Sequence, residues 1–239
     1  MKYMGSKNRI AKHILPIMLE YREERPWIEP FVGGGNMIDK VGGVRIGYDI
    51  NQDAIDALIL IRDGVESIAS DNTNFTENDY KEIPRGLNNK TPHQAFAAFA
   101  YSFGGKHLGG WARGNKSSGE PRDYVNEANR NAVKQSPFLQ GVHFEKKPFQ
   151  DISLSQSCLI YCDPPYKRTT GYKTRSFNHE LFWKWCQRMS NEGHVVFVSE
   201  YSGPEYASIV WEKEVNSSLT KNTGSKKATE KLFLVKRST

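Results

Sequence analysis

The feature that most constrains the fold is an apolar run that ends in two adjacent prolines, SCLIYCDPPY at residues 157–166. A short and continuously apolar run predicts a strand buried within a sheet. Pro164 and Pro165 have no N–H donor and cannot continue that sheet. The chain therefore turns at the carboxyl end of the strand, which is the place where ligands bind in open α/β sheets.

The first third of the chain alternates strand and helix signals. A short strand over residues 27–31 leads to the glycines at 33–35, and residues 44–49 alternate as a second strand. Asn51 is placed to cap a helix over residues 52–62, whose apolar residues fall on one side. This order predicts an open α/β sheet with right-handed crossovers.

The last third returns to this pattern after a middle segment of different character. Asn178 is placed to cap an amphipathic helix, and the middle has helix-like pieces at residues 92–101 and 124–135 without a comparable strand signal. We therefore expect a domain formed by residues 1–71 and 145–239, with an insertion over residues 72–144. The strands expected in the last third cover residues 157–162, 194–199, 209–215 and 231–235.

Composition excludes several classes of protein. No apolar run in the 239 residues approaches the roughly 18 needed to cross a bilayer. The first residues contain no long apolar stretch and no cleavage site typical of a signal peptide, so a cytoplasmic protein is expected. The chain has 33 Lys and Arg against 27 Asp and Glu. The resulting net charge of +6 suits a polyanionic partner, although many proteins that bind no nucleic acid carry as much.

The cysteines and histidines give no sign of a metal site. Cys158, Cys162 and Cys186 form an odd set without a second pair, so reduced thiols that pack as small buried hydrophobes are expected. The six His are scattered along the chain without ligand spacing. We therefore expect no metal ion.

The residues after the apolar strand carry the most chemical information. Asp163 and the Pro164 carbonyl are two hydrogen-bond acceptors at a stiff turn, and Tyr166 adds a flat aromatic face. Two acceptors beside an aromatic ring suit a planar base with an exocyclic amino group. The alternative is an ordinary strand-to-loop turn. We refer to residues 163–166 as the DPPY turn.

The second informative segment is EPFVGGGN at residues 29–36. Glycines after a first strand let the backbone approach a ligand closely. The segment is neither a GxGxxG fingerprint nor a P-loop, which disfavours NAD and nucleoside triphosphates. Asp49, at the end of the next strand, is placed to accept hydrogen bonds from ribose hydroxyls. We refer to residues 33–35 as the glycine turn.

The segments EPFVGGGN, YDIN (residues 48–51) and YCDPPY, in this order, resemble the Dam-type, D12 class, alpha-group DNA adenine N6-methyltransferases. The opening KYMGSK at residues 2–7 and the middle FGGKHLGGWAR at residues 103–113 also resemble the family, so the resemblance covers nearly the whole chain. It implies a Rossmann-like, S-adenosylmethionine-dependent methyltransferase sheet with helices on both faces. It also implies that residues 72–144 form a small, mainly helical target-recognition region.

The resemblance implies roles for individual residues. Asp163, Pro164, Pro165 and Tyr166 would form the catalytic turn that holds a flipped target adenine in duplex DNA. Ile152 stands where the family usually has an aromatic residue after its adenine-contacting acid, which weakens the match at the preceding position. The S-adenosylmethionine contacts would come from Tyr3, Lys7, Phe31, Gly33, Gly35, Asp49 and Asp151.

The cationic residues of the middle segment are candidates for DNA contacts, because Lys and Arg bind phosphates and read guanine edges. The alternative is a solvated loop. We refer to residues 103–122 as the basic loop. The candidate DNA-binding residues are Lys106, His107, Arg113, Lys116 and Arg122.

Three functions remain open at this point. The first is a site-specific DNA adenine N6-methyltransferase, in a restriction-modification system or as an orphan or phage methylase. The second is a cytosine-N4 or RNA amino-methyltransferase of the same build, because the DPPY turn suits an amine on another base. The third is a catalytically silent nucleic-acid-binding module. The sequence defines neither a recognition site nor an oligomeric state.

Overall fold

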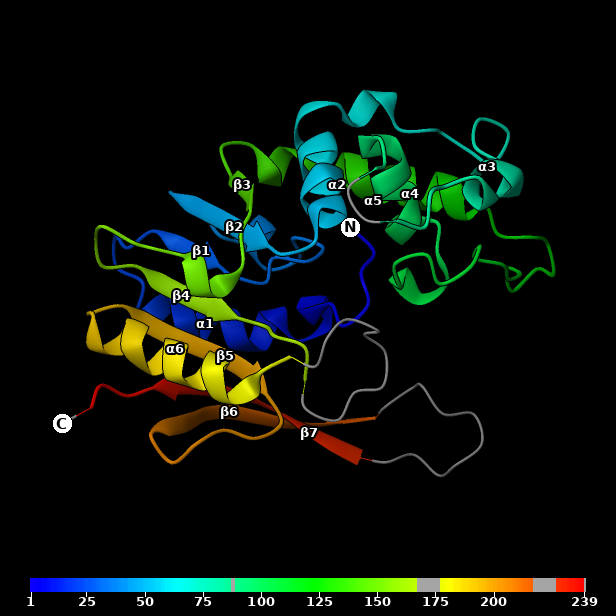
Figure 1. Cartoon of the computed structure of the whole chain (residues 1–239). Coiled ribbons are helices and arrows are strands. Elements are labelled where there is room, and N and C mark those ends of the chain that lie inside the picture. The colour runs from blue at the N-terminus through cyan, green and yellow to red at the C-terminus, as the bar shows by residue number, and fades with distance from the viewer. Residues whose placement is uncertain (87–88, 167–176, 217–226, 239) are drawn as a thin grey trace. The chain divides into compact units, whose positions relative to one another are not determined.

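The computed structural model describes residues 1–86, 89–166, 177–216 and 227–238. Within these residues, seven strands form one sheet in the order β3-β2-β1-β4-β5-β7-β6 (Figure 1). The pairs β1–β4, β2–β3 and β4–β5 are parallel, whereas β7 is antiparallel to both β5 and β6. A mostly parallel sheet with one antiparallel strand pair at its edge is the open α/β sheet expected from the sequence, so the predicted fold class is confirmed. The strands are β1 Trp27–Glu29, β2 Arg45–Asp49, β3 His143–Lys146, β4 Leu159–Cys162, β5 Val195–Glu200, β6 Ala207–Asn216 and β7 Lys227–Val235.

Most helices begin where a polar side chain caps the first turn. The Asn51 and Asn178 side chains accept backbone N–H groups at the starts of α2 and α6, as the sequence predicts. Thr76 and Thr91 form complete capping boxes for α3 and α4, and Asp123 caps α5. The helices are α1 Ala11–Glu20, α2 Gln52–Asp63, α3 Glu77–Lys81, α4 Pro92–Ala100, α5 Tyr124–Leu139 and α6 His179–Asn191.

The chain divides into two compact units, and the expected domain boundaries stay a prediction. The first comprises Met1–Arg9 and Val32–Lys147, and the second Ile10–Phe31 and Pro148–Thr239. In the first unit, α2 packs against α4 and α5 (Figure 1). Helices α4 and α5 of the expected insertion pack directly on α2. Residues 72–144 therefore fall into the same compact unit as residues 32–71. The assignment of residues 72–144 to target recognition stays a prediction.

The second unit carries helices on both faces of its strands. Tyr21, at the end of α1, packs its ring edge on Phe197 of β5 with centroids 5.5 Å apart, and Trp183 of α6 contacts Phe233 of β7 at 5.9 Å. Phe233 pairs with Val198, which follows Phe197 in β5. Successive side chains of a strand point to opposite faces, so α1 and α6 cover opposite faces of β5 and β7.

Two elements contradict the sequence predictions. Strand β3 begins at His143, inside the middle segment that was expected to lack strands. Its alternation is weak, because Phe144 is the one buried residue in a strand of otherwise polar side chains. Helix α1 was not predicted, and Pro16 lies inside it. Between the last two predicted strands, residues 217–226 lie outside the described part of the chain.

The buried residues agree with the interpretation of the cysteines. Cys158, Cys162 and Cys186 are free thiols buried in the core, and burial raises the pKa of the Cys158 thiol to about 11. Among the described residues, no three His, Cys, Asp or Glu side chains are grouped so that they could hold a metal ion. No helix in that part of the chain is both long and apolar enough to cross a membrane.

Candidate active site

The DPPY turn lies at the carboxyl end of β4, as predicted. The strand is fully buried between β1 and β5, and the Tyr161 hydroxyl bonds to the Ser199 hydroxyl of β5 at 2.8 Å. Asp163 follows the last residue of the strand and is half-buried, while Pro164 is buried. A rigid strand therefore holds the Asp163 carboxylate and the Pro164 carbonyl in consecutive positions at the sheet edge.

The Tyr166 ring is held by two residues that sequence reasoning missed. Its hydroxyl donates to Glu230 Oε1 of β7 at 2.9 Å, and its ring meets the Tyr201 ring edge to face at 4.7 Å. Burial, together with the negative charges of Asp163 and Glu230, raises the pKa of Tyr166 well above its ordinary value. The hydroxyl therefore stays protonated at physiological pH and remains a donor. Neither contact has a local sequence signal, because both partners come from distant segments.

Two predicted cofactor residues of the second unit have different surroundings. Phe31 packs in a cluster of aromatic rings, with centroid distances of 5.6 Å to Phe149, 5.8 Å to Phe177 and 5.6 Å to Phe182. Asp151 ends the short 3₁₀ turn Phe149–Asp151 and is exposed. The turn that carries Asp151 is thus anchored to Phe31 through Phe149.

Asp49 organises the glycine turn in the first unit. Its carboxylate accepts the Gly33 N–H at 3.0 Å and the Asn51 N–H at 2.9 Å, so the structure brings Gly33 and Asp49 together. Gly33 and Gly35 adopt φ angles of +49° and +66°, which favour glycine. Burial raises the pKa of Asp49 to about 6, although backbone N–H groups of Asn51, Gly33 and Ile50 oppose the shift. Asp49 is therefore a buried carboxylate that ionises near neutrality.

The N-terminal segment covers the glycine turn. A Cβ atom at Gly33 would lie 2.8 Å from the Tyr3 ring, so Tyr3 occupies the space that this glycine leaves free. The Met4 N–H donates to the Gly105 carbonyl at 3.0 Å, and the buried Lys7 ammonium donates to the Gly5 carbonyl at 3.0 Å. Tyr3 thus lies against Gly33, and Lys7 belongs to the same segment; their contacts with the cofactor stay a prediction.

Gln135 is a third residue that sequence reasoning missed. This buried side chain of α5 donates its amide to the carbonyls of Gly34 at 3.2 Å and Gly35 at 3.1 Å, and to Asp39 at 2.9 Å. These bonds hold the glycine turn from the side of α5. The available signal was a polar residue on the apolar face of a predicted helix, which is a weak one.

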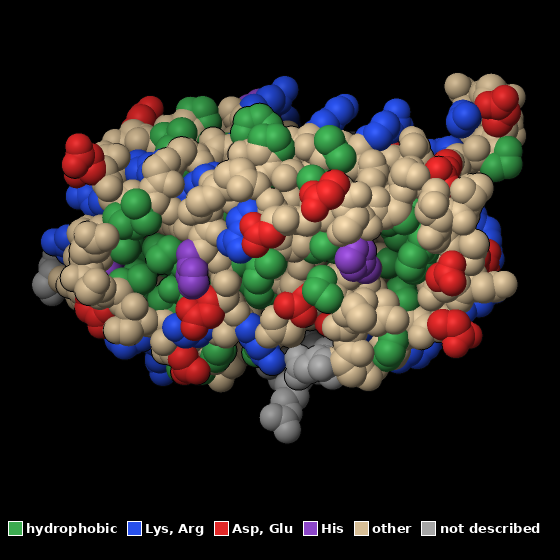
Figure 2. Space-filling model, turned by 90° about the horizontal axis from the view of Figure 1, so that it is seen from above, with side chains coloured by type: hydrophobic (Ala, Val, Ile, Leu, Met, Phe, Trp, Pro, Cys, Tyr) green, Lys and Arg blue, Asp and Glu red, His purple; other side chains and the backbone are tan. Residues whose placement is uncertain are grey.

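The cations of the basic loop are paired with carboxylates. Arg113 contacts Glu77 at 2.5 Å, and Lys116 contacts Glu120 at 3.0 Å. Acidic and basic side chains are correspondingly interspersed on the face shown in Figure 2. DNA phosphates would therefore have to replace carboxylates as partners of these residues. Lys106 is exposed, and its predicted DNA contact stays a prediction.

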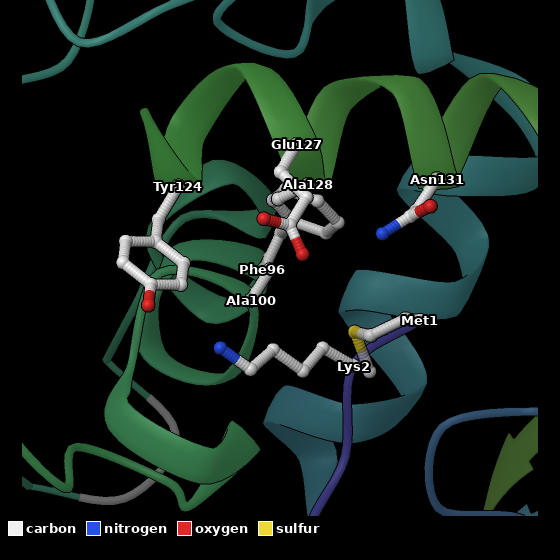
Figure 3. Close-up of a pocket in the computed structure, with 8 residues that line it drawn as sticks. All are labelled: Met1, Lys2, Phe96, Ala100, Tyr124, Glu127, Ala128 and Asn131. Carbon is white, nitrogen blue, oxygen red and sulfur yellow. The ribbon is translucent and has the colours of Figure 1, made fainter. Parts of the chain in front are cut away.

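Arg122 belongs to a small cluster around Tyr124. The Arg122 guanidinium pairs with Glu127 and lies 4.8 Å from the Tyr124 ring centroid, and the Lys2 ammonium lies 4.9 Å from the same centroid. Figure 3 shows the Lys2 side chain extending past Glu127 toward Tyr124. The pocket that these residues line has a volume of about 10 Å³, which is room for no more than a water molecule.

His107 takes part in a buried ion cluster. Its Nε2 lies 2.7 Å from Asp53 Oδ2, and the same oxygen is 3.0 Å from the Lys90 ammonium. The Asp53 and Lys90 side chains are 2% and 0% exposed. Burial opposes ionisation of Asp53, but the bonds from His107 and Lys90 outweigh it and hold its pKa below the ordinary value. The cluster fastens the basic loop and Lys90 to the start of α2.

The residues at the glycine turn fit a ribose-bearing cofactor. A carboxylate has about four acceptor positions. Backbone N–H groups of Gly33, Ile50 and Asn51 bond to Asp49, which leaves capacity for a further donor such as a hydroxyl. This position after β2 is where doubly wound sheets hold ribose.

A family model supplies the decisive comparison. The model described as D12 class N6 adenine-specific DNA methyltransferase matches residues 3–100 and 109–229. The chain belongs to this family. The matched residues include the glycine turn, Asp49 and the DPPY turn, whereas Lys106 and His107 lie in the unmatched interval.

Solved structures that resemble the chain have low sequence identity. A Pyrococcus horikoshii protein assigned as an RNA methyltransferase is 10% identical, with a TM-score of 0.47 over 95% of this chain and 83% of that one. A methylase from Haemophilus influenzae is 10% identical, with a TM-score of 0.38 over 96% and 89%. A protein assigned as a methyltransferase, in complex with SAH, is 10% identical with a TM-score of 0.37 over 100% and 55%. A comparison with curated proteins finds no match.

Proposed function

We propose that this member of the D12 family transfers a methyl group from S-adenosylmethionine to N6 of a flipped adenine at specific sites in duplex DNA. The observation that carries the proposal is the DPPY turn, because it places two acceptors and an anchored aromatic ring at the carboxyl end of a buried central strand. Membership of the family supports DNA as the substrate and N6 of adenine as the acceptor.

The cofactor contacts would come from the residues that the family resemblance implies. Asp49 would accept a ribose hydroxyl, Gly33 and Gly35 would form the turn beside it, and Tyr3 and Lys7 would close over it from the N-terminal segment. Phe31 and Asp151 are the remaining proposed contacts. S-adenosylmethionine, when bound, supplies an electrophilic methyl group on a sulfonium.

The DPPY turn would align and activate the target amine. The Asp163 carboxylate and the Pro164 carbonyl would accept the two N6 hydrogens, while Pro165 keeps the turn stiff. The carboxylate would stabilise the positive charge that develops on N6 as the new bond forms, which is an electrostatic effect of several kcal/mol. Tyr166 would stack on the flipped base, offsetting the few kcal/mol that unstacking costs.

The test is mass analysis of nucleosides after the protein has been incubated with DNA and cofactor carrying a deuterated methyl group. The proposal predicts labelled N6-methyladenine from duplex DNA. Labelled N4-methylcytosine, or label recovered only from RNA, would favour the second function. Cofactor binding without any labelled nucleoside would favour the silent module.

A further inference from the structure

A cavity of about 160 Å³ lies in the first unit, between α3 and the part of the basic loop that follows α4. Tyr80 and Trp111 contribute aromatic side chains to its lining, and Lys81, Arg85 and Arg113 contribute cations. A protein cavity of roughly 150 Å³ accommodates a benzene molecule. The volume is therefore that of one small planar ring, and no residue of the DPPY turn or the glycine turn takes part in the lining.

The aromatic side chains of the cavity are held in place before any ligand arrives. Trp111 meets Tyr80 at a centroid distance of 5.6 Å and Tyr101 at 6.2 Å, both edge to face. The segment that carries Trp111 is fixed by the bonds Phe103 N–H to Gly110 O and Ala112 N–H to Tyr101 O, each 2.9 Å. Trp111 remains half-buried, so part of its indole stays open for stacking.

The Tyr80 hydroxyl is an unusual polar group. The side chain is 6% exposed, and its hydroxyl oxygen is buried without a hydrogen-bond partner among the described residues. Buried polar groups in folded proteins are nearly always bonded, and an unsatisfied one is costly. Because the oxygen itself is buried, a base edge would become its partner only if the Tyr80 ring turned the hydroxyl toward the cavity.

The charged side chains of the cavity favour an anion. Lys81, Arg85 and Arg113 line it with a single carboxylate, Glu77, which contacts Arg113 at 2.5 Å and Lys81 at 2.9 Å. Three cations beside one acid leave a local positive excess. Aromatic faces for stacking, next to cations for a backbone phosphate, are the two features that single-stranded nucleic-acid sites combine.

We propose that this cavity binds one nucleotide of the DNA substrate that has left the base stack, with its base against Trp111 and Tyr80 and its phosphate near Arg85 and Arg113. The inference rests on the proposed function, because a DNA substrate supplies the nucleotide. It adds a second base site, formed by α3 and the basic loop, to the adenine site at the DPPY turn.

The test compares two labelled duplexes that differ only in one additional, unpaired thymidine. Thymine has no exocyclic amine that could donate a hydrogen bond to Asp163. The wild-type protein is expected to bind the bulged duplex about tenfold more tightly, because stacking of one base on an aromatic side chain contributes binding free energy of about that size. Trp111→Ala should abolish this preference. Trp211→Ala, a truncation of a half-buried tryptophan in β6, should leave it unchanged.

Tyr80→Phe separates a binding role from a structural one. The variant removes an unsatisfied hydroxyl, so its Tm should rise, by about 2–4 °C for a chain of this size. Its preference for the bulged duplex should fall several-fold, because the base loses a hydrogen-bond partner. A role in packing alone predicts the higher Tm with no change in binding, and that result would overturn the assignment of the hydroxyl and the cavity.

Equal binding of the two duplexes by the wild-type protein would overturn the proposal, as would a Trp111→Ala variant that weakens both by the same factor. If Trp111→Ala fails to fold, Tyr80→Phe decides the question. A preserved bulge preference without labelled N6-methyladenine would contradict the proposed function and still support the cavity as a nucleotide site.

Discussion

At the scale of single residues, the site depends on carboxylates whose surroundings set their roles. Asp49 is buried and accepts hydrogen bonds from backbone N–H groups. Asp53 is buried between the side chains of Lys90 and His107, and Asp163 lies half-buried at the end of β4. The sequence motifs predicted the positions of Asp49 and Asp163, because both follow strands with clear signals. The partners of Asp53 could not be predicted, since Lys90 and His107 reach it from distant segments.

Asp49 makes the stability of the first unit depend on pH. Its pKa of about 6 lies above the ordinary value of 3.8, so the folded protein binds this proton more tightly than the unfolded chain. The contribution to the free energy of unfolding is full below pH 3.8 and is lost as the pH rises through 6, by about 3 kcal/mol in all. Denaturant unfolding from pH 4.5 to 7.5 should show wild type losing stability relative to Asp49→Asn. A difference that does not vary with pH would contradict this assignment.

The hydroxyl of Tyr166, as well as its ring, is expected to contribute to methyl transfer. Its hydroxyl is bonded to Glu230, so Tyr166→Phe should lower the methylation rate about tenfold by loosening the ring, as loss of a hydrogen bond to a charged group implies. Tyr166→Ala should be much worse, because stacking is lost. Glu230→Ala should match Tyr166→Phe, and the double variant should be no slower than either, measured as single-turnover rates. Additive losses would show that the two side chains act independently.

At the scale of elements, the apolar runs and the helix caps predicted most of the strands and helices around the site. Strands β2, β4 and β5 and helices α2 and α6 lie where periodicity and the Asn51 and Asn178 caps predicted them. Helix α1 and strand β3 were missed because α1 contains a proline and β3 has one buried residue in four. The contact of Gln135 with the glycine turn is long-range and had no local signal.

The ion cluster at the start of α2 determines how the basic loop is attached. Asp53→Ala would leave the Lys90 ammonium buried and without this carboxylate, so it should destabilise the protein by about 3–5 kcal/mol. The double variant Asp53→Ala/Lys90→Met should recover much of this loss, because it removes both charges. The measurement is a double-mutant cycle of the free energy of unfolding. Strictly additive effects would show that the two charges are not coupled in solution.

At the scale of the whole molecule, charges are balanced locally although the net charge is +6. Glu77 contacts Arg113 and Lys81, so Glu77→Gln should free two cations. We expect it to strengthen DNA binding several-fold at low salt and to steepen the dependence of affinity on salt. Glu180→Gln is the matched control, because Glu180 also pairs with an exposed lysine but lies on α6 in the second unit. Equal gains in DNA affinity from both variants would show that the effect comes from the change in net charge alone.

The account as a whole depends on the DPPY turn being the catalytic centre. The direct measurement is single-turnover methylation of adenine in duplex DNA by Asp163→Ala, with S-adenosylmethionine affinity and Tm measured on the same preparation. We predict a folded protein that binds the cofactor with nearly wild-type affinity and has lost nearly all methyl transfer. Asp163→Asn should also be severely impaired, because it keeps an acceptor but loses the charge. An Asp163→Ala variant that methylates adenine at nearly the wild-type rate would contradict the central claim.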